Sequence, residues 1–313
     1  MKKLSLPCKP AGFKHYWKYQ MTLAKKSKVS YAFVFPYMLL FTLFTILPVL
    51  ISVFLSFTTF NMMEPPTFVG IDNYLRLFFS DGIFPIALRN TLLIAVVTGP
   101  IGYLMSLMLA WFINELPRTM RAIVTVIYYS PTIAGNVYLI WALLFSGDSY
   151  GYVNSLLIKL GIIQSPILWL QNPDYILPIA IVVILWLSLG AGFLALIAGF
   201  QGVDRSYYEA AAVDGIKNRF QELWFVTLPI MKNQLMFSAV MTITASFGVG
   251  DVITGLFGYP TTRYTAQTLM NHLSDYGSMR FEMGYASAIA TLLFFMMVFT
   301  NQIIKKMLSK IGV

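Results

Sequence analysis

The sequence predicts an all-α protein that crosses a membrane with six helices, and two observations predict it. Of the 313 residues, 58% are hydrophobic and only 11% are charged, whereas soluble globular proteins carry about 25% charged residues. Six uncharged runs, of which the fifth is the shortest, are near or above the roughly 20 residues that cross a bilayer. They cover 29–63, 90–114, 122–147, 175–203, 233–250 and 283–304. Runs of this length without alternation exclude a membrane β-barrel, so we expect the spans to be helices.

The first run, 29–63, follows a basic stretch, as the apolar region of a secretory signal peptide would. It is too long for such a region and no small-residue cleavage pattern follows it, so we expect it to remain as the first span. We therefore divide the chain into a basic N-terminal segment, 1–28, and one transmembrane domain, 29–313, which includes a polar loop at 204–232. Cys8 is the single cysteine, so no disulfide framework is expected.

The distribution of Lys and Arg predicts the orientation. Residues 1–28 contain eight Lys and no acidic residue, and six spans place them on the same side as the 115–121 turn, the 204–232 loop and the C-terminal tail. The opposite side has only five of the 22 basic residues: Arg76, Arg89, Lys159, Arg263 and Arg280. Because cytoplasmic loops carry the excess of Lys and Arg, we expect both termini and the 204–232 loop in the cytoplasm. The net charge of +9 is then explained by topology and indicates no nucleic-acid partner. We expect the Lys-rich N-terminus to be attracted to anionic lipid headgroups instead.

Proline and glycine interrupt four of the predicted spans. The interruptions are Pro36 and Pro48 in the first, Gly99 and Pro100 in the second, Pro131 and Gly135 in the third, and Gly190 and Gly192 in the fourth. Such breaks are tolerated where neighbouring helices or a water-filled cavity satisfy the freed backbone groups. They are typical of a conduit whose helices move, although small residues also serve ordinary packing in a membrane bundle.

Two segments on the outer side carry patterns of their own. Segment 148–174 has apolar residues at helical spacing with two polar residues between them: Val153, Leu156, Leu157 and Leu160, with Asn154 and Lys159. This pattern predicts a short amphipathic helix on the membrane or on the bundle. Segment 261–281 is long and polar, and its residues are either available for a partner or simply solvated: Arg263, Asn271, His272, Asp275 and Arg280.

The sequence has no enzyme signature. It lacks a phosphate-binding G-x-x-x-x-G-K-[ST] loop, an H-E-x-x-H motif and any Cys/His metal spacing, and the topology places His15 and His272 on opposite sides. We therefore expect no enzyme activity and no cofactor in this chain. An ion-coupled carrier usually has several ionisable groups inside its spans, whereas Asp251 is the main candidate here. Active transport would therefore take its energy from a partner.

The 204–232 loop predicts two short helices. Ser206 and Glu209 form a capping-box pattern, with Asp204 as a competing cap, so the first helix is expected to begin near Tyr207. Gly215 suits a left-handed end of this helix. A second helix is expected through Phe220, Glu222 and Trp224, ending at Pro229, which suits the first turn of the fifth span. A purely local capping role for Glu209 is the alternative.

This loop resembles the cytoplasmic docking loop of the permease subunits of binding-protein-dependent ABC importers, in particular the carbohydrate group that includes the maltose and glycerol-phosphate permeases. The matching residues, in the family's order, are Glu209, Ala210, Ala211, Asp214, Gly215, Leu228 and Pro229. Similar phrases occur at 68–74, 88–92 and 284–288, and the resemblance extends from about residue 33 onward. The sequence departs from the pattern in three places. Ten residues separate Gly215 from Val226 where nine are usual, Asp204 replaces a proline, and Gly258-Tyr259-Pro260 replaces Gly-Gly-Pro.

The resemblance implies a type I ABC importer permease in the bacterial cytoplasmic membrane that forms half of the path for a sugar or oligosaccharide. Its partners would be a second permease in a heterodimer, two ATPase subunits that bind ATP and Mg, and an extracytoplasmic solute-binding protein. Glu209 would pair with a basic residue of the ATPase, while Ala210, Ala211 and Gly215 allow close approach. Family solute contacts come from the fourth and fifth spans, which here indicates Trp186, Ser188, Ser246 and Asp251. An ion-coupled secondary transporter, an ABC importer for a non-sugar solute, and a membrane scaffold or receptor remain as alternatives.

Overall fold

A computed structural model describes residues 28–308. Cys8, His15, Lys310 and nearly all of the basic segment 1–28 lie outside the described residues. The chain divides into two units, 1–54 and 55–313. The first contains α2 (Lys28–Phe41), a π-helical turn η1 (Thr42–Ile46) and most of α3 (Leu47–Leu55), which together form one candidate span. Pro36 lies inside α2, and the helix continues past Pro48 after the π turn.

The first span is shorter than its apolar run. It ends at Leu55, and residues 56–63, which we expected to continue it, instead form a loop that contains strand β1 (Thr58–Thr59). Strand β1 pairs in an antiparallel manner with β2 (Thr67–Phe68). The buried Asn73 side chain donates to the carbonyls of Ser56 and Thr58, at 2.9 and 2.8 Å. These hydrogen bonds satisfy the carbonyl groups of residues that follow the end of the helix. Apolar composition alone could not indicate that the helix ends here.

The second unit has three candidate spans without a large bend and two bent ones. The first three are α5 (Phe84–Asn114), α9 with α10 (Pro173–Leu187, Ala191–Gln201), which are separated by a short break, and α17 (Met283–Leu308). The third predicted span is bent by 91° between α6 (Arg118–Ile133) and the η3–α7 segment (Asn136–Tyr138, Leu139–Leu144). The fifth is bent by 42° between α14 (Lys232–Ala245) and α15 (Gly250–Phe257). Within residues 28–308 the six-span prediction agrees with the structure when each bent pair counts as one span.

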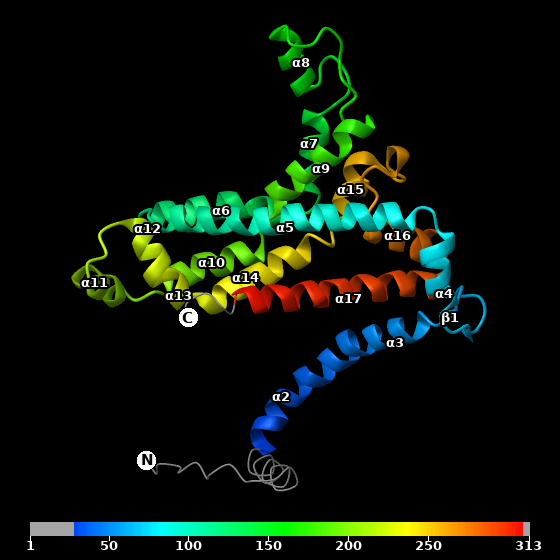
Figure 1. The fold of residues 1–313 in the computed structure, drawn as a ribbon, viewed down its shortest axis with the longest axis horizontal. Helices are drawn as coiled ribbons and strands as arrows, with labels where there is room; N and C mark the ends of the chain where they lie inside the picture. The colour runs from blue at the N-terminus through cyan, green and yellow to red at the C-terminus, as the bar shows by residue number, and fades with distance from the viewer. Residues whose placement is uncertain (1–27, 309–313) are drawn as a thin grey trace. The chain divides into compact units, whose positions relative to one another are not determined.

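Helices α5, α10 and α14 pack against one another and form the centre of the bundle (Figure 1). Glycine allows the approach of α10 to α14, because a Cβ atom at Gly192 would lie 2.6 Å from the Thr242 Oγ1 and 2.9 Å from the Ser238 carbonyl oxygen. A Cβ atom at Gly102 of α5 would lie 2.8 Å from the Ser188 Oγ, just after α9. The packing role considered for the span glycines thus applies at Gly192.

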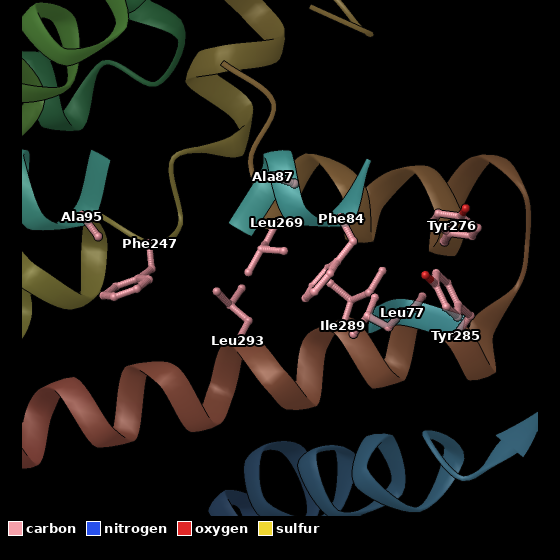
Figure 2. Packing of buried hydrophobic residues seen from close by; sticks show 11 residues of the cluster. Leu77, Phe84, Ala87, Ala95, Phe247, Leu269, Tyr276, Tyr285, Ile289 and Leu293 are labelled. Atoms are coloured by element: carbon pink, nitrogen blue, oxygen red, sulfur yellow. The ribbon is translucent and has the colours of Figure 1, made fainter. Parts of the chain in front are cut away.

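A second packed region joins α17 to the start of α5 and to α16 (Leu269–Ser274). Figure 2 shows Phe84 and Leu269 directed toward Ile289 and Leu293 of α17. Two short elements, α4 (Asp72–Leu75) and the π turn η2 (Arg76–Ser80), lead into α5. At the start of α17, a Cβ on Gly284 would lie 2.0 Å from the carbonyl oxygen of Thr58. Glycine is therefore needed where strand β1 meets the α17 backbone.

The segment 148–174 contains the expected helix, α8 (Tyr152–Lys159). Its Asn154, which we placed between the apolar positions, is fully buried. The Asn154 amide nitrogen lies 3.0 to 3.1 Å from the carbonyls of Ser146, Asp148 and Ile167, and its oxygen accepts from the Ile167 N–H and the Trp169 Nε1–H. Leu156 and Leu160 are instead more than half exposed. The loop therefore folds around a polar centre.

The segment 261–281 is not a solvated loop. It contains η5 (Thr262–Tyr264), α16 and the π turn η6 (Asp275–Met279). Three of the polar residues expected to be available or solvated are buried: Asn271, His272 and Asp275. Burial is possible because each has hydrogen-bonding or ionic partners from other elements, which a loop reading of the sequence does not include.

Candidate functional site

The polar loop at 204–232, called here the docking loop, begins with helix α11 (Arg205–Val213). Its N-cap is Asp204, whose Oδ1 accepts the Ser206 N–H at 2.9 Å. Hydrogen bonds from Ser206 also hold the pKa of the Asp204 carboxyl below its usual value. The capping box that we expected from Ser206 and Glu209 is therefore wrong, because the helix starts two residues earlier than Tyr207. Glu209 is instead 70% exposed, with its Oε1 3.3 Å from the Nε of Arg205.

The end of α11 is as the sequence predicts. Gly215 has a φ of +95°, and its N–H donates to the Ala212 carbonyl, while the Ile216 N–H donates to the Ala211 carbonyl at 3.0 Å. Nothing lies within 4 Å of a Cβ built on Gly215. The glycine is therefore required by its left-handed backbone and not by lack of space.

The second docking helix is interrupted by a π turn. It consists of α12 (Arg219–Glu222), capped by the Asn218 side chain, then the π turn η4 (Leu223–Thr227) and the short α13 (Leu228–Ile230). A π turn takes one residue more than an α turn to close its hydrogen bond. It can thus accommodate the tenth residue between Gly215 and Val226. Pro229 lies in α13 and not in the first turn of the span, because the chain turns at Met231 before α14 begins.

One face of the docking loop packs against the helix bundle, and the other, called here the open face, is exposed. Ala211 and Leu228 are buried, so the close-approach face that we expected to include Ala211 is reduced to Ala210 and Gly215. The Tyr208 and Thr227 hydroxyls are hydrogen-bonded at 2.9 Å, which joins α11 to η4. Arg219 forms ion pairs with Glu115, at the end of α5, and with Glu222. Glu209, Ala210, Asp214 and Gly215 are exposed and form the open face. Four large apolar side chains of the loop are also exposed, although Phe220 packs edge-on against Trp111 of α5: Val213, Phe220, Trp224 and Phe225.

A cavity of about 350 Å³ lies in the bundle where three spans are interrupted. These interruptions are the end of α6, the 188–190 break between α9 and α10, and the 246–249 bend between α14 and α15. The Thr132 hydroxyl donates to the Leu189 carbonyl at 2.9 Å and so joins two of them. None of the described residues that line the cavity is charged, and its polar side chains are hydroxyls: Thr98, Thr132, Ser188, Thr242 and Ser246.

The structure separates the four residues expected on the solute path. Ser188 and Ser246 line the cavity, each donating to a carbonyl of its own helix, at Leu185 and Ile243. Trp186 packs edge-on against Trp141, with the ring centres 5.6 Å apart, and is not part of the lining. Asp251 lines a different pocket, described below.

Sequence reasoning missed three cavity hydroxyls, Thr98, Thr132 and Thr242. Thr132 stands next to the interruption that the sequence did indicate at Pro131 with Gly135, and this position could have identified it. Thr98 stands beside Gly99 and Pro100, where we expected an interruption, but α5 continues through both residues. Thr242 has no such signal in the sequence. Its hydroxyl is buried and has no hydrogen-bond partner among residues 28–308.

A buried polar group also joins three elements of the second unit. The Asp81 Oδ2 lies 2.7 Å from both the His272 Nε2 and the Tyr285 hydroxyl, and its Oδ1 accepts the N–H groups of Ile83 and Phe84. Burial opposes the charge of Asp81, but the hydrogen bonds from His272 and Tyr285 hold the pKa of Asp81 well below its usual range. This group joins η2, α16 and α17. Across the described part of the chain, no cluster of three His, Cys, Asp or Glu side chains could hold a metal ion.

Comparison with known proteins gives the family. Residues 99–310 match the model described as "Binding-protein-dependent transport system inner membrane component". The chain belongs to this family. It is a membrane-embedded permease component of a transport system and not an enzyme.

Relatives agree with this assignment over most of the chain. The probable ABC transporter permease protein YesP of Bacillus subtilis is 33% identical over 283 residues, which cover 86% of each protein. The lactose transport system permease protein LacF of Rhizobium radiobacter is 32% identical and covers 72% of this chain and 74% of its own. A crystal structure of a bacterial ABC transporter that imports the acidic polysaccharide alginate superposes with a TM-score of 0.75 at 24% identity, covering 94% of this chain and 99% of that one. This last likeness supports the all-α importer permease fold.

Proposed function

We propose that this permease forms half of the path of an ATP-driven importer for a sugar or oligosaccharide. The relatives' substrates support the proposal, since LacF carries lactose and AraP of Bacillus subtilis carries arabinooligosaccharides. A similar fold occurs in an alginate transporter crystallised with a pentasaccharide-bound periplasmic protein. In this proposal a second permease completes a heterodimer, and an extracytoplasmic solute-binding protein delivers the sugar. The membrane is the bacterial cytoplasmic membrane, with both termini and the docking loop in the cytoplasm.

The observation that carries the proposal is the docking loop, with one face fixed to the bundle and the other open. Two ATPase subunits, which bind ATP and Mg, close on ATP and move these loops. In the proposed contact, α11 enters a cleft of the ATPase, with Ala210 and Gly215 allowing close approach and the Glu209 carboxylate meeting a basic residue. Ala211, Leu228 and Pro229 support α11 from the bundle side, while Asp214 lies beside Gly215 on the open face.

The proposed solute path passes through the hydroxyl-lined cavity. Ser188 and Ser246 contact the solute there, and the Thr242 hydroxyl, which has no partner within residues 28–308, is available to a sugar hydroxyl. Trp186 contributes through its packing on Trp141, and Asp251 lies at the outer mouth. The basic segment 1–28 is adjacent to lipid headgroups, and the single transmembrane domain spans 29–313 in this proposal.

Reconstitution with the co-purified partners tests the transport class. We expect uptake into proteoliposomes to require ATP and the solute-binding protein. Uptake driven by a proton or sodium gradient alone would instead support a secondary transporter. ATP-dependent uptake of an amino acid or ion, with no sugar transported, would favour a non-sugar importer, and no flux under any condition would favour a scaffold.

Variants of Glu209 test its proposed contact with the ATPase, and a variant of its ion-pair partner Arg205 serves as the control. Glu209→Lys is expected to uncouple ATP hydrolysis from uptake while membrane insertion is retained. Arg205→Gln removes the same ion pair but leaves the Glu209 carboxylate, so coupling should persist. Equal uncoupling by both variants would show that Glu209 acts only within α11.

The cavity has a comparable pair of variants. Thr242→Val removes a buried hydroxyl that lines the cavity, whereas Ser106→Ala removes a fully buried hydroxyl of α5 that lies outside the lining and also lacks a partner among the described residues. Only Thr242→Val is expected to raise the solute concentration at half-maximal uptake. A similar effect of both would exclude this assignment of the path.

A further inference from the structure

A second pocket, of about 370 Å³, lies where the outer halves of the two bent spans meet. Segment η3 contributes Asn136 and Tyr138, and α15 contributes Asp251. The remaining wall includes Tyr259 and Asp275. Membrane transporters commonly place solute sites at discontinuous helices, and both sides of this pocket are formed by helices that are interrupted at its edge.

Contacts between elements fix the walls of this outer pocket. A Cβ on Gly255 would lie 2.2 Å from the Tyr138 ring, so only glycine allows the ring to rest on α15. The Tyr138 hydroxyl donates to the Asn136 Oδ1 at 3.2 Å. The buried Asn271 amide donates to the Gly250 carbonyl and to the Thr254 hydroxyl, at 2.8 and 2.7 Å, which joins α16 to α15. The pocket is therefore part of the folded bundle and not a gap between loops.

The pocket contains one carboxylate that is unpaired. Asp275 is 8% exposed and pairs with Arg280 at 2.7 Å. Burial and the nearby Asp275 charge raise the pKa of Tyr259, so its hydroxyl stays protonated at neutral pH. Asp251 is exposed and has no ion-pair or hydrogen-bond partner among residues 28–308. The described lining includes no Lys or Arg, so the net charge that a solute meets here is negative.

We propose that the outer pocket is a subsite for one unit of an uncharged saccharide and that Asp251 disfavours acidic saccharides. The inference rests on the proposed sugar-import function. Sugar hydroxyls donate to the Asp251 carboxylate and to the Asn136 amide oxygen, while the Tyr138 and Tyr259 rings offer apolar surface to the sugar ring. A uronate or sulfonate in the same place would bring two negative charges together with no basic side chain of the described lining to compensate.

The outer pocket and the hydroxyl-lined cavity share helix α15. Val249 and Val252 line the cavity, whereas Asp251 and Thr254 line the outer pocket. The outer pocket is therefore a second candidate site next to the cavity, and only a solute of more than one sugar unit could contact both.

The charge of the pocket can be measured without a known solute. In the complete transporter, in nanodiscs and with Cys8→Ser as background, Ser274→Cys places a thiol on the pocket wall. Its rates of modification by cationic and anionic methanethiosulfonates give a ratio that reports the local charge. Asp251→Asn is expected to lower the ratio about fivefold, as loss of one unit charge at short range should. Asp174→Asn, which removes an exposed acid of α9 outside the pocket lining, should leave it unchanged. An unchanged ratio in Asp251→Asn overturns the proposal.

Protection of the same thiol identifies the class of saccharide. The probes are neutral gluco-, xylo- and arabino-trisaccharides, compared with trigalacturonate at matched ionic strength. We expect at least one neutral trisaccharide, and not trigalacturonate, to slow modification at least threefold. Stronger protection by trigalacturonate, or none by any probe, overturns the subsite. If ATP-driven sugar uptake is observed in that case, the import function stands without the subsite, whereas absence of all sugar uptake refutes the import function itself.

Discussion

The docking loop, 204–232, and the outer segment, 261–281, are both polar stretches between spans, yet a pair of ionisable side chains in each lies in an opposite environment. In the docking loop, the Arg205 and Glu209 side chains are 90% and 70% exposed. In the outer segment, the His272 and Asp275 side chains are 1% and 8% exposed. The outer residues join elements of the same chain, whereas the docking-loop residues remain open to a partner. Polar composition therefore identifies a segment outside the bilayer but does not say whether its charges serve stability or binding.

Asp81→Ala tests the stability side of this comparison and should have the largest effect. It leaves the buried His272 and Tyr285 without their shared acceptor, which is expected to lower the free energy of unfolding by about 3 kcal/mol. Thermal and denaturant unfolding in detergent would measure it. Asp81→Asn is the matched control, because its amide oxygen can still accept the Ile83 and Phe84 N–H groups. If Asp81→Ala lowered the free energy of unfolding no more than Glu209→Ala does, the contrast between the two segments would be contradicted.

The same carboxylate gives a pH prediction. The pKa of Asp81 is lowered in the folded protein, so its contribution to stability is fully present above the ordinary Asp value of about 4. It is lost as the pH falls through the lower, folded-state pKa. The stability difference between the wild type and Asp81→Ala should therefore narrow only below about pH 4. A loss of the Asp81 contribution near neutral pH would contradict the ionised state of this carboxylate in the folded protein.

Asn154→Ala extends the comparison to the other outer segment, with a somewhat smaller expected effect. Removing the fully buried amide leaves the carbonyls of Ser146, Asp148 and Ile167 without this donor. We expect a loss of about 2 kcal/mol, concentrated in local opening of 146–169. Limited proteolysis and hydrogen exchange of this segment would detect it. Asn154→Asp keeps an acceptor for the Ile167 and Trp169 N–H groups but places a buried carboxylate oxygen against the same three carbonyls, so it should cost at least as much as Asn154→Ala.

Deletion of Phe225 tests the second docking helix. Because the π turn takes one residue more than an α turn, removing this exposed residue should convert η4 to an α turn and keep Leu228 and Pro229 in place. The expected cost is about 1 kcal/mol or less, with coupling to ATP hydrolysis retained. Deletion of Ala212, within α11, serves as a control because it would rotate Glu209 relative to Gly215. If the Phe225 deletion prevented the protein from inserting into the membrane, the π turn would not be a simple one-residue addition to an α turn.

The sequence predicted those features that depend on local chemistry, and it failed where distant residues meet. Long apolar runs and the left-handed Gly215 follow from the bilayer and from backbone sterics, and both were predicted. The length of the first span was not, because the loop after Leu55 is held by Asn73, a partner from another element. The same applies to Asn154 and His272, whose polar side chains appear solvated until the contacts of the fold are known. Ser188 and Ser246 line one cavity, and their contact with a solute stays a prediction, whereas the Trp186 ring packs against Trp141.

Glu209→Gln should have the smallest effect on stability and thereby separates binding from folding. The carboxylate is 70% exposed and its pair with Arg205 lies on the surface, so the expected change in the free energy of unfolding is within about 0.5 kcal/mol. Affinity for the ATPase subunits, measured by co-purification and by stimulated ATP hydrolysis, should nevertheless fall. Arg205→Gln should match it in stability and not in affinity. If the two variants also have the same affinity for the ATPase subunits, the Glu209 carboxylate has no specific role in binding a partner.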